Sequence, residues 1–224
     1  MNELVRSLKA AGTRLSKRVL DEMYLDPYWN DRFGVRGRGH SETDGDFHLK
    51  YIVSALESND PSLFVTYSKW LREVLTSRGM CSLHLADNFD LLADAISEET
   101  WPVKEAAIQS LRRGSAGLAY GSGDAHPVDQ LRATAVPALV ERVVSAQPDA
   151  DKKRLAADAA HLLSFLADGL AFTTDRVAPY ARYLLVSYER RGIARTELTT
   201  LLAAIAELPT LPAAAKALVQ EALG

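Results

Sequence analysis

Residues 60–79 read DPSLFVTYSKWLREVLTSRG, and this stretch carries the clearest structural signal in the chain. Its apolar side chains recur three and four positions apart, which places them on one face of an α-helix; they are Leu63, Phe64, Tyr67, Trp70, Leu71, Val74 and Leu75. Asp60 can cap the first turn, Pro61 tolerates that turn, and Gly79 suits the left-handed conformation that closes a helix. The stretch therefore predicts an amphipathic helix between Asp60 and Gly79.

The same spacing recurs along the rest of the chain, and no segment alternates apolar and polar residues clearly enough to predict a strand. We expect further helices over residues 2–24, 41–58, 81–97, 101–111, 128–146, 150–170, 174–191, 196–207 and 213–223. The glycine-rich stretch from Ser115 to Pro127 predicts a linker. The predicted fold class is therefore all-α, a bundle of about ten helices.

Composition narrows the class of protein. The chain has 224 residues, 47% of them hydrophobic, which is enough for an ordinary core, and its net charge of -3 disfavours a nucleic-acid partner. Its single cysteine, Cys81, excludes an internal disulfide and a multi-cysteine metal site, so we expect the cytoplasm. Charges occur throughout residues 1–20, which predicts neither a signal peptide nor a membrane span.

The chain also resembles itself at an offset of 113 positions. This offset matches His48 with His161, Leu49 with Leu162, Tyr67 with Tyr180, Trp70 with Tyr183, Leu71 with Leu184, Arg78 with Arg191 and Gly79 with Gly192. Further on the offset becomes 110, where Pro102 meets Pro212. We therefore expect two similar five-helix halves, residues 1–117 and 118–224. The alternative is a chance alignment of helical segments with similar apolar stripes.

The most unusual segment is residues 26–40, DPYWNDRFGVRGRGH, in which three glycines alternate with arginines and a histidine. Glycine lets the backbone turn sharply, and arginine favours carboxylates or phosphates. We expect a loop that suits an acidic ligand group. It lacks the strand–loop–helix setting of a nucleotide-binding loop. The alternative is an ordinary loop between helices whose arginines pair with carboxylates of the protein itself.

Catalytic motifs are missing from the sequence. It contains no Glu-x-x-His pair for a di-iron site and no HExxH spacing among its five histidines. No nucleophile elbow occurs, and Cys81 with His84 lacks an orienting acid. We therefore expect no enzyme and no metal site.

Aromatic residues with a few polar groups favour a ligand-binding helical protein instead. The candidate lining is Trp29, Phe33, His48, Tyr51, Tyr67 and Trp70, with Arg32, Arg36 and Arg38 at the mouth. A flat apolar ligand with carboxylates would suit such a site, as haem and open-chain tetrapyrroles do. The alternative is that these aromatic residues only fill the core.

The order of these residues resembles the N-terminal helical region of bacterial cobalamin-binding sensor proteins. The resemblance covers residues 26–96 and rests on Trp29, Arg32, Phe33, Gly34, Arg36, Gly37, Arg38, His48-Leu49, Tyr51, Asp60-Pro61, Phe64, Tyr67, Trp70-Leu71 and Arg78-Gly79. Those regions are similar to non-haem globins (alloglobins or photoglobins), relatives of the phycobiliproteins for which bilin binding is known or proposed. The resemblance implies a globin-like fold and a sensor or photoreceptor role in signalling.

The resemblance also implies a ligand, a linear tetrapyrrole such as biliverdin. Phycobiliproteins attach bilin through a cysteine closely followed by an Arg-Asp pair, whereas Cys81 is followed by Ser82-Leu83-His84. We therefore expect non-covalent binding, with His48, His84 or Asp87 meeting the pyrrole N–H groups.

Two other functions remain open. One is a haem globin with His48, His84 or His161 as the axial ligand. The other is a ligand-free helical module that forms a homodimer or docks a signalling protein.

Overall fold

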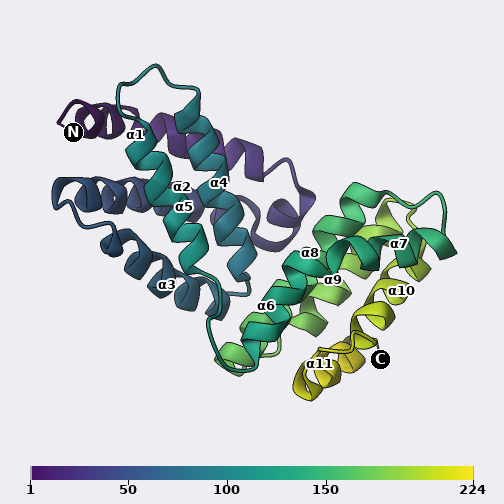
Figure 1. The fold of residues 1–224 in the computed structure, drawn as a ribbon. Coiled ribbons are helices and arrows are strands. Elements are labelled where there is room, and N and C mark those ends of the chain that lie inside the picture. The colour runs from purple at the N-terminus through teal and green to yellow at the C-terminus, as the bar shows by residue number, and fades with distance from the viewer. Residues whose placement is uncertain (1, 224) are drawn as a thin grey trace. The chain divides into compact units, whose positions relative to one another are not determined.

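In the computed structural model, which describes residues 2–223, the described chain is helical and contains no strand (Figure 1). The helices are α1 (Asn2–Met23), α2 (Pro27–Glu57), α3 (Ser62–Ser77), α4 (Ser82–Ser97), α5 (Glu105–Gly117), α6 (Ala125–Thr134), α7 (Val136–Ala146), α8 (Lys152–Phe172), α9 (Val177–Arg190), α10 (Arg195–Ala206) and α11 (Ala213–Leu223). The prediction of an all-α fold of about ten helices is confirmed.

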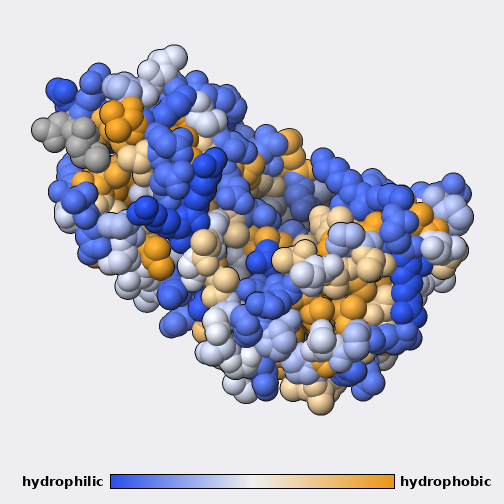
Figure 2. Space-filling model, in the orientation of Figure 1, coloured by the Kyte–Doolittle hydropathy of each residue, from blue (hydrophilic) through white to orange (hydrophobic). Residues whose placement is uncertain are grey.

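The chain divides into two compact units, each with its own core. Unit 1 comprises Met1–Arg72 and His84–Leu118, and unit 2 comprises Glu73–Leu83 and Ala119–Gly224. The units differ from the predicted halves in the placement of Leu118 and of residues 73–83, the turn between α3 and α4 with the ends of both helices. On the face drawn in Figure 2, hydrophilic side chains predominate and apolar ones gather in smaller patches.

Residues 27–40 are helical apart from the break at Gly34, so the predicted loop is wrong. Asp26 caps α2 by accepting a hydrogen bond from the Tyr28 N–H at 2.9 Å, and helical structure continues to Glu57. The backbone leaves helical geometry inside α2 at Gly34, with φ 58° and ψ −159°. Each glycine costs a helix only about 1 kcal/mol relative to alanine, which packing of the intervening residues can offset. The segment is therefore a broken helix rather than a loop.

Counting α2 as two segments, α1 to α5 give six helical segments, as many as α6 to α11. The turns after α3 and α9 also have the same hydrogen bonds 113 positions apart. Met80 N–H donates to the Leu75 carbonyl at 3.1 Å, and Ile193 N–H donates to the Tyr188 carbonyl at 2.8 Å. The glycine before each donor has a positive φ, 90° at Gly79 and 67° at Gly192. This is the correspondence that a duplication would produce.

Helix α8 forms the centre of unit 2. It is the one described helix long and apolar enough to span a membrane by length and composition, but 61% of its apolar window is buried inside the protein. Such burial is usual for a core helix of a soluble protein. The structure is therefore compatible with a soluble protein, and the cytoplasmic location stays a prediction.

A side chain of α8 caps α4. The buried carboxylate of Asp168 accepts hydrogen bonds from the Ser82 N–H at 2.6 Å, the Ser82 hydroxyl at 2.5 Å and the Tyr120 hydroxyl at 2.5 Å. The Ser164 hydroxyl accepts another from the Leu83 N–H at 3.0 Å. N–H groups in the first turn of a helix have no partner within the helix. Residues far away in the sequence therefore satisfy the start of α4.

We expect Gly34→Ala to destabilise the protein by about 1–3 kcal/mol, because φ 58° with ψ −159° is a conformation that only glycine adopts readily. Gly39→Ala is the matched control. Gly39 lies within α2, and a methyl group added there would contact nothing within 4 Å. That control should stabilise the protein by about 0.5–1 kcal/mol. Urea unfolding measures the free energy of unfolding of both variants. Equal effects of the two substitutions would contradict the break at Gly34.

Candidate functional site

Most of the predicted site residues lie in two aromatic clusters of unit 1. The α4 cluster comprises Tyr24, Tyr28, Trp29, Phe33 and His84. The α3 cluster comprises His48, Tyr51, Phe64, Tyr67, Trp70 and Phe89. The single lining expected from the sequence is thus divided between two places.

The α4 cluster is centred on the buried imidazole of His84. Its ring stacks on Tyr28 with 4.9 Å between centroids and an interplanar angle of 18°. Trp29 meets the same imidazole nearly edge-on at 5.1 Å, and Phe33 stacks on Trp29 at 5.6 Å. The three aromatic residues come from residues 27–33, the part of α2 before Gly34. The first segment of α2 therefore lies over His84.

Arginines lie at the edge of the α4 cluster. The Arg32 guanidinium lies 5.6 Å from the Phe33 ring centroid, and the Arg38 guanidinium lies 4.8 Å from the Tyr24 ring centroid. Arg38 also forms an ion pair with Asp21. Two of the three predicted carboxylate-binding arginines therefore contact this cluster. The third, Arg36, is exposed to solvent.

The α3 cluster contains a buried polar pair. His48 Nδ1 lies 2.8 Å from the Tyr67 hydroxyl, within hydrogen-bonding distance. Burial lowers the pKa of His48 to about 4, and a hydrogen bond with Asn88 opposes this change. Burial, with a smaller contribution from the charge of Asp44, raises the pKa of Tyr67. Both groups are therefore neutral at pH 7.

The α3 cluster reaches the surface through two further rings. Tyr51 stacks on Tyr67 with 3.9 Å between centroids and 15° between planes, and Trp70 lies 6.1 Å from Tyr67. Tyr51 is 40% exposed and Trp70 is 55% exposed. Exposed Phe47 lies one helical turn before Tyr51 on α2. Unit 1 thus presents aromatic side chains to solvent on α2 and α3.

The predicted site did not include the cluster residues Tyr24, Tyr28, Phe64 and Phe89, or Asp44 beside them. Asp44 shares a helix face with His48 and Tyr51 at positions i, i+4 and i+7, a spacing that could have indicated it. Tyr28 had no comparable signal, because its contact with His84 joins distant segments. The predicted ligand Asp87 is exposed on α4, three residues after His84.

The second half carries charged side chains where unit 1 carries small or neutral ones. Arg154 forms ion pairs with Asp158 and Glu197, and the Tyr188 hydroxyl donates to Asp158 at 2.5 Å. At the offset of 113, Arg154, Asp158, Glu197 and Tyr188 correspond to Ser41, Gly45, His84 and Leu75, respectively. His161, the counterpart of His48, has its Nδ1 2.9 Å from the Ala157 carbonyl oxygen. The two halves therefore differ at His84, while Tyr180 and Tyr183 repeat the aromatic contact of Tyr67 and Trp70.

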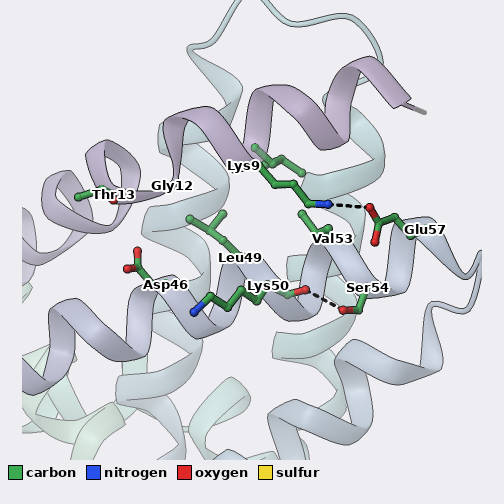
Figure 3. A pocket seen from close by; sticks show the side chains of 10 residues that line it. Lys9, Gly12, Thr13, Asp46, Leu49, Lys50, Val53, Ser54 and Glu57 are labelled. Atoms are coloured by element: carbon green, nitrogen blue, oxygen red, sulfur yellow. Dashed lines mark hydrogen bonds and ion pairs between the residues drawn. The ribbon is translucent and has the colours of Figure 1, made fainter.

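Two of the hollows described in unit 1 lie along α1 and α2. One is a groove of about 380 Å³ between α1 and α2 (Figure 3), and another is a cavity of about 10 Å³ beside His48 and Asn88, about the size of one water molecule. The rings of each cluster contact one another and occupy the interior themselves. A ligand as large as a tetrapyrrole therefore has to displace side chains of the α4 cluster to enter it.

No cluster of three or more His, Cys, Asp or Glu side chains that could hold a metal ion occurs within residues 2–223. No protein-family model, curated protein or solved structure matches this chain. The resemblance to non-haem globins therefore stays a prediction, and the residues described above carry the functional argument.

We expect the His48 imidazole to make stability depend on pH. Its pKa is about 4 in the folded protein and about 6.5 in an unfolded chain, so the unfolded state binds the extra proton between these values. Stability is therefore full above about pH 6.5 and falls by about 3 kcal/mol as the pH decreases towards 4.

Unfolding free energies measured from pH 4 to pH 7.5 test this dependence. His48→Gln should remove most of the fall while an amide at this position can still bond to Tyr67. His161→Gln is the control, since His161 is only half-buried, and should retain the wild-type fall. The same pH dependence in wild type and His48→Gln would contradict the assignment.

Proposed function

We propose that unit 1 is a non-enzymatic sensor module that binds a linear tetrapyrrole such as biliverdin non-covalently at the α4 cluster. The observation that supports this most is His84, a buried imidazole stacked among aromatic rings whose edge carries Arg32 and Arg38. An apolar interior with a cationic rim suits a flat ligand that ends in carboxylates.

Each group has a role in this proposal. The conjugated rings of the tetrapyrrole stack on Tyr28 and Trp29, and its propionates pair with Arg32 and Arg38. A ring nitrogen of His84 that carries no proton can accept a hydrogen bond from a pyrrole N–H. Cys81 is 1% exposed, which disfavours thioether formation in the folded protein.

Ligand entry requires movement of residues 27–33. This segment supplies the rings over His84, and it joins the rest of α2 through Gly34, which lacks the helical geometry of its neighbours. In the second half, Glu197 stands at the position that corresponds to His84, and it forms an ion pair with Arg154. We therefore assign ligand binding to unit 1.

Absorption titrations with biliverdin and haem, made separately, test the proposal. Biliverdin should give a saturable, red-shifted band at one equivalent. Replacing Arg32 and Arg38 together by alanine should weaken binding about tenfold or more, because each charge-assisted hydrogen bond contributes about 1.5–3 kcal/mol. Arg113→Ala, which removes an exposed arginine of α5, is the control and should bind as wild type.

Two outcomes would overturn the bilin assignment. A Soret band with haem alone, lost on replacing His84 or His48, would indicate a haem globin. Absence of binding by both tetrapyrroles would leave the helical interaction module as the function of the chain.

The exposed rings of the α2–α3 face favour that interaction module as a second candidate. Phe47, Tyr51 and Trp70 are 44%, 40% and 55% exposed, and aromatic side chains are enriched at protein interfaces. A homodimer or a signalling partner would bury them.

Analytical ultracentrifugation over a range of concentrations tests self-association through this face. A dimer should form as concentration rises, and Trp70→Ser should shift the midpoint to at least tenfold higher concentration. The control is Val186→Ser, which changes an exposed apolar residue of α9. A wild-type monomer at all concentrations would exclude the homodimer.

A further inference from the structure

We propose that the Asp168 carboxylate of unit 2 is a positioning group for the ligand site of unit 1. It holds the first turn of α4, and that turn sets the imidazole of His84 against its aromatic neighbours. Asp168 thus acts on the site to which tetrapyrrole binding is assigned, so the inference rests on that proposed function. It gives the second half of the chain a part in a site to which it contributes no ring.

The chain passes between the two units at three places, which are residues 72–73, 83–84 and 118–119. Ser82 lies just before the second of these connections, and Tyr120 lies just after the third. Asp168, a buried residue of α8, accepts hydrogen bonds from the N–H and hydroxyl groups of Ser82 and from the hydroxyl group of Tyr120. One carboxylate therefore holds the chain beside two of the three connections.

The hydrogen bonds from α8 reach the turn of α4 that carries His84. Asp168 binds the Ser82 N–H at 2.6 Å, and the Ser164 hydroxyl binds the Leu83 N–H at 3.0 Å. These N–H groups belong to the first two residues of α4, which have no acceptor inside the helix, and His84 is the third residue. Because helical backbone geometry fixes the direction of a side chain, these bonds orient the imidazole.

The ring contacts of His84 require this orientation. The imidazole stacks on Tyr28 with 4.9 Å between centroids and 18° between planes, and it meets Trp29 at 5.1 Å. Stacking depends on the offset and tilt of the two rings, so a frayed first turn of α4 would lose it. The position of the imidazole therefore depends on an acceptor that unit 2 supplies.

The corresponding helix of the second half lacks an equivalent of this carboxylate. At the offset of 113, Ser82 corresponds to Arg195, the first residue of α10, and Asp168 corresponds to Ala55. The methyl group of Ala55 cannot accept a hydrogen bond, and the N-cap residue of α10, Ala194, forms no side-chain cap either. The Asp168 cap is therefore found at the helix that carries His84 and is not repeated at its counterpart.

The glycine-rich stretch from Ser115 to Pro127 supplies one of the hydrogen bonds to Asp168, through Tyr120. The backbone of Tyr120 is held by α6, since its N–H donates to Asp129 at 3.2 Å and His126 Nδ1 lies 2.5 Å from its carbonyl oxygen. The phenol thus reaches the carboxylate from a fixed backbone. Movement of this stretch would change the group that caps α4, so the ligand site can be regulated through it.

NMR of the full chain without ligand tests the positioning role. Asp168→Ala should make the Ser82 amide exchange with solvent about tenfold faster or more, because a charged acceptor makes a strong hydrogen bond. It should also move the imidazole signals of His84 towards their positions in an unfolded chain, as the ring currents of Tyr28 and Trp29 are lost. His84→Gln identifies these signals among the five histidines.

Asp158→Ala is the matched control. Asp158 is also a buried carboxylate of α8 that accepts a hydrogen bond from a tyrosine hydroxyl at 2.5 Å, but its partner is Tyr188 of α9. Its loss should destabilise unit 2 and leave the His84 signals unchanged. Asp168→Asn keeps an acceptor for the Ser82 N–H and should give signals between those of wild type and Asp168→Ala.

Two milder variants test the same role if Asp168→Ala does not fold. Tyr120→Phe and Ser164→Ala each remove one hydrogen bond of the network, and both should shift the His84 signals in the same direction by a smaller amount. Wild-type His84 signals in folded Asp168→Ala or in both milder variants would overturn the proposal. Equal shifts in Asp158→Ala would also overturn it.

Biliverdin titrations separate this inference from the proposed function. Asp168→Ala should bind biliverdin about tenfold more weakly than wild type, and Asp158→Ala should bind as wild type. If wild type binds no tetrapyrrole, the proposed function fails while the imidazole signals still decide the positioning role. If wild type binds and Asp168→Ala keeps both its affinity and its His84 signals, the positioning role fails and the proposed function stands.

Discussion

The break in α2 at Gly34 is the constraint on which the candidate site depends. A positive φ with an extended ψ is accessible to glycine and strained for other residues, so the chain can change direction here inside a helical segment. The first segment of α2 then lies on α4, where Tyr28 and Trp29 cover the imidazole of His84. An unbroken helix of 31 residues would carry these rings along a single axis. The aromatic interior of unit 1 thus depends on one backbone conformation.

The two halves differ around His84, whose counterpart at the offset of 113 is Glu197. Both carry aromatic residues at the positions of Tyr67 and Trp70. The second half uses ion pairs of Arg154, which leave its side chains paired and partly buried. At the place of Glu197 the first half has His84, with Tyr28 and Trp29 against its ring. Stacked rings can be exchanged for another flat apolar group, whereas separating a buried ion pair leaves an uncompensated charge. This difference supports the assignment of ligand binding to the first half.

The spacing of apolar residues predicted the helices well, but the glycines between residues 26 and 40 led to a wrong prediction of a loop. The stretch from Asp60 to Gly79 contains α3, and Phe64, Tyr67, Leu71 and Leu75 of its apolar face are buried. Trp70 belongs to the same pattern but is exposed, because its position on the helix faces away from the core that the other helices form. Residues 27–40 are helical apart from Gly34, and the packing of Tyr28 and Trp29 on His84 can offset the weak preference of glycine against a helix.

The sequence by itself determined the all-α class and the turns that end at Gly79 and Gly192, because these depend on side chains a few positions apart. Only the tertiary structure decided that the aromatic residues form two clusters, that Arg36 faces solvent, and that Asp168 caps a helix that begins at Ser82. Contacts such as that of Asp168 join residues 86 positions apart. Local periodicity carries no information about such pairs, since it indicates which face of a helix is buried and not which partner covers it.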